Sequence, residues 1–240
     1  MGSDPSSLIS LSAAPRVRGA AARAFPLYGA AVALFHALFL ALALAAAPAK
    51  AEPEPARIMI LGDSIGAGFG LPASDALDAQ LALALAPLGR HVKVINASVS
   101  GDTTAGGLAR LDWVLADKPD IVILELGGND GLRGIDPKVT EANLDAILAR
   151  LRRAGVKVLF TGMYAPPNLG AEYGQRFNAV FPALAAKHHV EFYPFILEGV
   201  AADPALNQPD GIHPNARGVR IIAGRLLPHV ERLLGPPAQG

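Results

Sequence analysis

Asp210 and His213 stand three residues apart near the C-terminus, in the segment 210–214 (Asp-Gly-Ile-His-Pro). A histidine works as a general base when its ring is neutral and a carboxylate holds its second nitrogen, and this spacing supplies both groups from one short loop. A helix-capping aspartate beside a surface histidine would produce the same pattern. We expect Pro214 in the first turn of a C-terminal helix, with both side chains on the loop before it.

Ser64 lies in the segment 62–66 (Gly-Asp-Ser-Ile-Gly), directly after a short apolar run. A serine placed between a strand and a helix exposes its hydroxyl and turns its own N–H toward a bound anion. Taken alone, the pentapeptide is equally compatible with a turn in which the serine merely caps a helix. It becomes a candidate nucleophile only if a base lies within reach.

Two further polar segments follow apolar runs. The segment 127–130 reads Gly-Gly-Asn-Asp, and the segment 96–102 reads Asn-Ala-Ser-Val-Ser-Gly-Asp. Taken alone, the segment 127–130 is an ordinary turn, because Gly, Asn and Asp all tolerate unusual backbone angles. In a parallel sheet, however, Asn129 would point its amide across the strand ends toward Ser64. Gly101 would bring a backbone N–H close to a ligand, because it has no side chain in the way.

The elements that must position these residues alternate along the chain. Continuous apolar runs predict strands buried on both faces, at residues 58–61, 92–95, 121–126, 156–160 and 190–193. Asp136 and Pro137 predict a helix start, and Gly155 its end. Apolar residues spaced by three and four predict a last helix over 216–233. The alternation indicates a three-layer α/β/α fold with a five-stranded parallel sheet, whose ligands bind beyond the carboxyl ends of the strands.

In this order and at these strand ends, the motifs resemble those of the SGNH (GDSL-type) hydrolases. Ser64 lies in the Gly-Asp-Ser block, Gly101 in the glycine block, Asn129 in the Gly-x-Asn-Asp block, and Asp210 with His213 in the Asp-x-x-His block. The resemblance covers residues 57–234. Segments 96–107, 126–134 and 210–215 are similar to the subgroup of bacterial acyl thioesterases, lysophospholipases and small arylesterases. This resemblance implies a flavodoxin-like sheet, no cofactor, no metal and a broad range of acyl ester substrates.

The resemblance also implies a role for each residue. Ser64 is the nucleophile, His213 the base, and Asp210 the group that orients and stabilises the imidazolium. The N–H groups of Ser64 and Gly101 and the amide of Asn129 hold the oxyanion. The substrates implied are aryl esters, short-to-medium acyl esters, lysophospholipids and thioesters. The loop 163–170, after the fourth strand, is expected to wall the acyl pocket.

Other interpretations are weaker. An α/β-hydrolase also carries Gly-x-Ser-x-Gly, but it places several strands before its nucleophile and a long separation between acid and histidine. The glycines at 66, 68 and 70 do not have the Gly-x-Gly-x-x-Gly spacing of a dinucleotide site, and no Gly-Lys-Ser/Thr follows them. A carbohydrate O-acetyl esterase or a non-catalytic binding module on the same fold stays open as the alternative function.

Residues 1–51 read as an export signal. Arg16, Arg18 and Arg23 precede an uncharged run over 24–49, which ends in the small-x-small pattern of Ala49-Lys50-Ala51. We therefore expect cleavage after Ala51 and a periplasmic or secreted protein without stable membrane insertion. An uncleaved membrane anchor is the alternative, because the run is long enough to span a bilayer. The hydrolase domain is predicted over 52–235, with a frayed tail over 236–240.

The composition of the chain excludes some classes of partner and of chemistry. The 240 residues include 21 Lys and Arg, 21 Asp and Glu, and no cysteine. Balanced charge gives no electrostatic footprint for nucleic acid, and the missing cysteines exclude disulfides and thiolate chemistry. We expect a monomer whose partner is a small acyl ester or thioester. The other histidines, among them His188, are expected at the surface or as cations in last helical turns.

Overall fold

The computed structural model describes residues 25–45 and 54–236. The chain divides into two compact units, residues 1–53 and 54–240. In the first unit, α1 (Phe25–Ala45) is the described element. Within the described ranges, no helix combines the length and apolar character needed to cross a membrane. The predicted cleavage pattern at 49–51 and most of the predicted tail lie outside the described residues.

The second unit is built on five parallel strands in the order β2-β1-β3-β4-β5, which confirms the predicted fold class. This is the flavodoxin-like strand order. The strands are β1 (Ala56–Gly62), β2 (Val92–Asn96), β3 (Ile121–Glu125), β4 (Lys157–Thr161) and β5 (Glu191–Tyr193).

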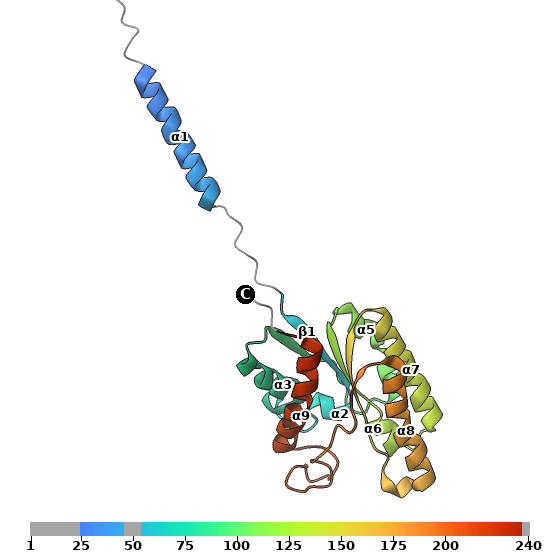
Figure 1. Ribbon diagram of the computed structural model, residues 1–240. Coiled ribbons are helices and arrows are strands. Elements are labelled where there is room, and N and C mark those ends of the chain that lie inside the picture. The colour runs from blue at the N-terminus through green and yellow to red at the C-terminus, as the bar shows by residue number, and fades with distance from the viewer. Residues whose placement is uncertain (1–24, 46–53, 237–240) are drawn as a thin grey trace, which may run out of the picture. The chain divides into compact units, whose positions relative to one another are not determined.

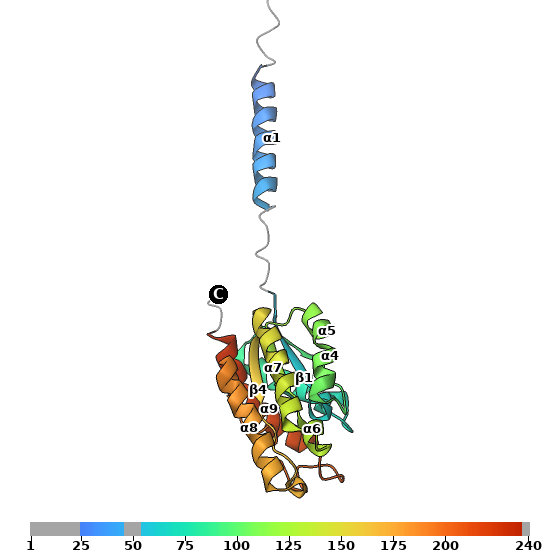
Figure 2. The same cartoon turned by 90° about the vertical axis from the view of Figure 1, so that its right-hand side faces the viewer.

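Helices cover both faces of the sheet (Figure 1). The helices α3 and α9 pack on one another at one face, and α7 packs with α4 and α8 at the other (Figures 1 and 2). Their bounds, with those of the short helices, are α2 (Ser64–Ala67), α3 (Leu77–Leu85), α4 (Thr104–Ala109), α5 (Leu111–Ala116), α6 (Gly128–Leu132), α7 (Pro137–Arg153), α8 (Ala171–His188) and α9 (Ala216–Leu234). Short 3₁₀ turns lie at Ala73–Asp75, Ala86–Leu88 and Pro167–Leu169.

The burial of each strand explains why the apolar runs predicted the strands, and where the burial they predicted was wrong. All of β3 and most of β1 and β4 are buried, because helices cover both of their faces. The edge strands β2 and β5 are mostly half-buried. The prediction that all five strands are buried on both faces is therefore wrong for these two, since an edge strand has a neighbour on one side only.

The helix predictions are also confirmed in part and wrong in part. Asp136 caps α7 through its side chain, Pro137 is its first residue, and Gly155 follows its end with a positive φ of 73°. Pro214, however, lies before α9 rather than in its first turn. The side chain of Asn215 accepts the N–H groups of Arg217 and Gly218 at 2.9 and 3.2 Å, so the helix begins at Ala216.

Candidate active site

The turn after β1 exposes the hydroxyl of Ser64. Asp63 is the N-cap of α2, and its Oδ1 accepts the N–H of Ile65 at 3.0 Å. The cap is therefore the aspartate and not the serine. The Ser64 Oγ is left free for another partner and lies 2.9 Å from Nε2 of His213, across 149 residues of sequence.

His213 is held by its own loop. Oδ1 of Asp210 accepts the N–H groups of Ile212 and His213 at 2.9 and 3.0 Å, while Oδ2 lies 2.7 Å from Nδ1 of the ring. Hydrogen bonds from the ring and then from the two backbone N–H groups lower the pKa of Asp210 to about 2. An ionised Asp210 requires the proton on Nδ1, which leaves Nε2 of the neutral ring to accept the Ser64 hydroxyl proton.

Asn129 and Gly101 come from the ends of β3 and β2. Asn129, on α6, lines the same cavity as Ser64 and His213, and its Nδ2 donates to Oδ2 of Asp63 at 3.3 Å. Gly101 has a positive φ of 85° in the loop before α4. It is not among the residues that line the cavity.

The cavity beside Ser64 has a volume of about 300 Å³. The loop after β4 supplies residues 163–167 to its wall, but the predicted remainder, residues 168–170, does not line it. Sequence patterns missed Phe195 and Leu197, which follow β5. The rings of Tyr164 and Phe195 stack with their centroids 4.4 Å apart. The cavity therefore has an apolar, partly aromatic wall and a polar end at Ser64.

A model of the GDSL-like lipase/acylhydrolase family matches residues 60–221, most of this unit. The chain belongs to that family. It is 44% identical to the esterase TesA of Pseudomonas aeruginosa over 178 residues, which is 74% of this chain and 89% of the relative. It is 40% identical to thioesterase 1/protease 1/lysophospholipase L1 of Escherichia coli strain K12, over 74% of this chain and 84% of the relative.

Solved structures agree with the family assignment. The psychrotrophic esterase EstA from Pseudoalteromonas, solved in a form inhibited by monoethylphosphonate, superposes with a TM-score of 0.71 at 31% identity. The match covers 75% of this chain and 98% of EstA. The family model and the solved structure thus agree on the fold and the family of this GDSL-like chain.

Phe69 is a site residue that sequence reasoning missed. Its ring lies 4.6 Å from the His213 ring, tilted by 39°, and the side chain is about half exposed. Nε2 of Gln208 donates to the carbonyls of both Phe69 and Pro214, at 2.7 and 3.0 Å. These contacts tie the loop after Ser64 to the loop that carries His213, so that the imidazole is held from two sides.

A pair of buried acids lies beneath Ser64, and no sequence pattern indicated it. Oε2 of Glu125 accepts the N–H groups of Asp63 and Gly66, both at 3.1 Å. Burial raises the pKa of Asp63 to about 6. Burial, and then the charge of Asp63, raise the pKa of Glu125 well above its usual range. Burial beside the Asp63 carboxyl therefore favours the protonated, neutral form of Glu125.

This pair predicts a pH dependence of stability. Both folded-state pKa values are raised above the ordinary 3.8 and 4.5, so the folded protein binds these protons more tightly than the unfolded chain. The stability they contribute is fully present below those ordinary values and is lost as pH rises toward the folded-state values. Glu125→Gln keeps an acceptor oxygen for the two N–H groups without a titrating proton.

We therefore expect the free energy of unfolding of Glu125→Gln to fall less between pH 5 and pH 8 than that of the wild type. Urea unfolding at both pH values measures the difference. Glu141→Gln, at an exposed helical position, is the matched control and should follow the wild type. An equal pH dependence in the Glu125 variant would mean that Glu125 is already ionised in the folded protein at pH 5.

The sequence predicts that activity is independent of metal ions. Among residues 25–45 and 54–236, no three His, Asp or Glu side chains are grouped so that they could hold a metal ion. Independence from metal therefore stays a prediction for this GDSL-like chain, to be checked by activity in the presence of a chelator.

Proposed function

We propose that this chain hydrolyses carboxylic acyl esters through an acyl intermediate on Ser64. The observation that carries the proposal is the series of contacts from Asp210 through His213 to the Ser64 Oγ, which ends at an apolar cavity. The names of the relatives, an esterase and a thioesterase/lysophospholipase, support the same class of chemistry.

In the acylation step, Ser64 Oγ attacks the carbonyl carbon while Nε2 of His213 takes the hydroxyl proton, and Asp210 stabilises the imidazolium. The N–H groups of Ser64 and Gly101 and the amide of Asn129 donate to the oxyanion, each worth about 3–4 kcal/mol in the transition state. The carbonyl–oxygen or carbonyl–sulfur bond then breaks, and His213 returns its proton to the leaving group. In the second step, His213 activates a water that releases the acid.

The cavity supports small acyl groups as substrates. A volume of about 300 Å³ is at the lower end of the range for ligand pockets, roughly 300–1,000 Å³. The proposed substrates are aryl esters and short-to-medium acyl esters, with single-chain phospholipids and thioesters added because relatives carry the names arylesterase and thioesterase 1/protease 1/lysophospholipase L1. The apolar wall at Tyr164, Phe195 and Leu197 favours an acyl chain over the acetyl group of a carbohydrate ester.

A phosphonate ester tests the proposal. We expect a fluorophosphonate to add one phosphonyl group per chain at Ser64, seen by intact mass and peptide mapping, and to abolish hydrolysis of p-nitrophenyl esters of two to sixteen carbons. Acetylated xylan belongs in the same substrate panel. Labelling at another residue, or xylan deacetylation as the fastest reaction, would overturn the proposal.

We also propose that residues 1–51 are an export signal and that the protein acts outside the cytoplasm as a monomer. The sequence pattern of basic flank, apolar run and small-residue exit supports the export signal. The mature chain is expected to begin at Glu52. Intact mass of the protein purified from periplasm or medium measures this, whereas full-length protein confined to the membrane fraction would indicate an anchor.

A further inference from the structure

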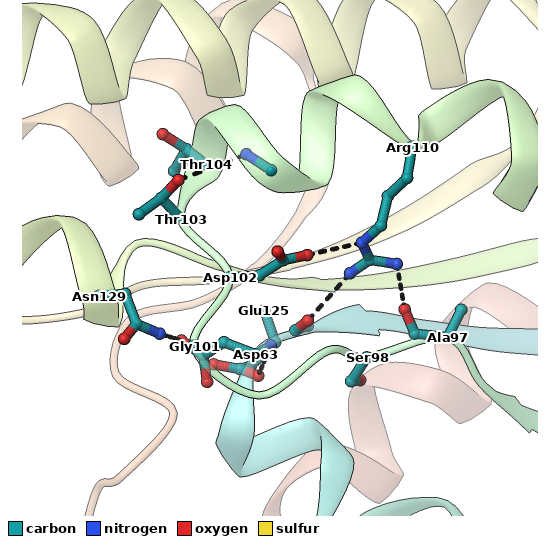
Figure 3. A network of polar contacts seen from close by, with 12 residues as sticks. Asp63, Ala97, Ser98, Gly101, Asp102, Thr103, Thr104, Arg110, Glu125 and Asn129 are labelled. Atoms are coloured by element: carbon teal, nitrogen blue, oxygen red, sulfur yellow. Dashed lines mark hydrogen bonds and ion pairs between the residues drawn. The ribbon is translucent and has the colours of Figure 1, made fainter.

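Arg110 connects the loops that follow β1 and β2, and no part of the proposed mechanism uses it. It lies where α4 ends and α5 begins, and its side chain turns back toward the strand ends. Its Nε donates to Oδ2 of Asp102 at 2.6 Å, its Nη1 to the carbonyl of Ala97, and its Nη2 to the carbonyl of Gly62 at 3.1 Å (Figure 3). The side chains of Arg110 and Asp102 are only 18% and 17% exposed.

The three acceptors belong to the segments that carry the proposed oxyanion donors. Gly62 ends β1, two residues before Ser64, and Asp102 directly follows Gly101. Ala97 follows β2, and its N–H donates to Ile60 in β1. One planar guanidinium therefore joins the Ser64 segment to the Gly101 segment. An ammonium group would replace it only in part, because a point charge lacks the fixed fork of donors.

The turn at Gly101 shows what this connection holds in place. The N–H of Asp102 donates to the carbonyl of Val99 at 3.0 Å, and Gly101 has its φ of 85° at the third position of this turn. A β-turn with a positive φ there is typical of type II and leaves the third N–H outside the turn's own hydrogen bond. Within the described residues, the Gly101 N–H has no partner, so it is free to bind a ligand.

The turn is fixed on both sides of Gly101. Before it, the N–H of Val99 donates to the carbonyl of Gly62, which also accepts a hydrogen bond from Arg110. After it, the Asp102 carboxylate packs over Gly106 in α4, where a Cβ would lie 2.5 Å from Oδ1. Packing against α4 thus fixes the position of the Asp102 carboxylate, and Arg110 links this carboxylate to the end of β1.

We propose that Arg110 is a positioning residue for the oxyanion site, which sets the N–H of Gly101 relative to that of Ser64. The proposal rests on the function proposed above. Donors preorganised around a developing charge are effective only if they are correctly placed, and a displacement of about 1 Å is enough to cost on the order of 10²-fold in rate. Loss of Arg110 should therefore act on the transition state more than on substrate binding.

The test compares Arg110→Met and Arg110→Lys with Arg150→Met, a control that removes a partly exposed arginine of α7 paired with Asp112 of α5. Each enzyme is assayed with p-nitrophenyl butyrate and its thiono analogue, in which sulfur replaces the carbonyl oxygen. Active sites are titrated with a fluorophosphonate, so that kcat refers to folded enzyme only.

We expect Arg110→Met to lower kcat on the oxygen ester by about 10- to 100-fold, with KM within about threefold of wild type. The ratio of oxygen-ester to thiono-ester kcat should fall as well, because sulfur accepts hydrogen bonds weakly and gains less from the donors. Arg110→Lys should show an intermediate loss, and Arg150→Met should behave as the wild type.

A role confined to folding would reduce the titratable fraction and leave kcat per site and the oxygen-to-thiono ratio unchanged, and this result overturns the proposal. So does a loss seen only in KM. If Arg110→Met does not fold, Asp102→Asn weakens the same contact and is held to the same criteria. Wild-type labelling at Ser64 with unaltered kinetics in the variants would leave the proposed function standing while this proposal fails.

Discussion

Ser64→Ala is expected to lower kcat for ester hydrolysis by about 10⁴-fold or more, because loss of the nucleophile in a serine triad leaves only binding and oxyanion stabilisation. The variant should fold as the wild type does, since Asp63 rather than Ser64 caps α2. Loss of one partly exposed hydroxyl should change the free energy of unfolding by no more than about 0.5 kcal/mol. Initial rates with p-nitrophenyl esters and thermal unfolding give the two quantities.

Ser98→Ala is the matched control for this experiment. Ser98 follows β2 near the same strand ends, but its hydroxyl donates to the carbonyl of Ile60 at 3.3 Å and has no contact with His213. Its turnover should stay close to that of the wild type. Residual activity of Ser64→Ala above about one per cent would require another nucleophile, and a loss of that size in Ser98→Ala would point to Ser98.

The parts of the fold that are local in sequence were predictable from it. Continuous apolar runs indicated all five strands, and the cap at Asp136 placed the start of α7. The contact of Ser64 with His213 spans 149 residues, yet it followed from family motifs placed at strand ends. The geometry brings these residues together, while their roles in catalysis stay predictions.

What sequence reasoning missed depends on contacts between distant segments. Glu125 is the last residue of an apolar strand, and only the folded chain shows that it accepts two N–H groups from the Ser64 turn. No sequence pattern indicated that Arg110 joins the segments that follow β1 and β2. His188 was expected at the surface or as a cation in a last helical turn. It lies in the last turn of α8 but is buried, with its Nε2 2.6 Å from Oδ1 of Asp145 in α7. Polar residues buried by tertiary partners leave no periodic signal in the sequence.

Asn129→Ala is expected to have the next largest effect, a fall in kcat of about 10²- to 10³-fold with little change in KM. One N–H of its amide donates to Oδ2 of Asp63, which fixes the side chain and leaves the second N–H for the cavity. That second donor gains most when the carbonyl oxygen becomes an oxyanion, so its loss raises the barrier more than it weakens substrate binding.

Asn143→Ala is the control for Asn129. Its Nδ2 donates to Thr104 Oγ1 at 3.1 Å, and it does not line the cavity, so its loss should reduce the free energy of unfolding and spare kcat. Steady-state kinetics per titrated site separate the two variants. The oxygen-to-thiono ester ratio adds a second criterion, because it should fall in Asn129→Ala and not in Asn143→Ala. A change confined to KM in Asn129→Ala would mean that the amide only positions the bound ester, and the oxyanion would then depend on the N–H groups of Ser64 and Gly101.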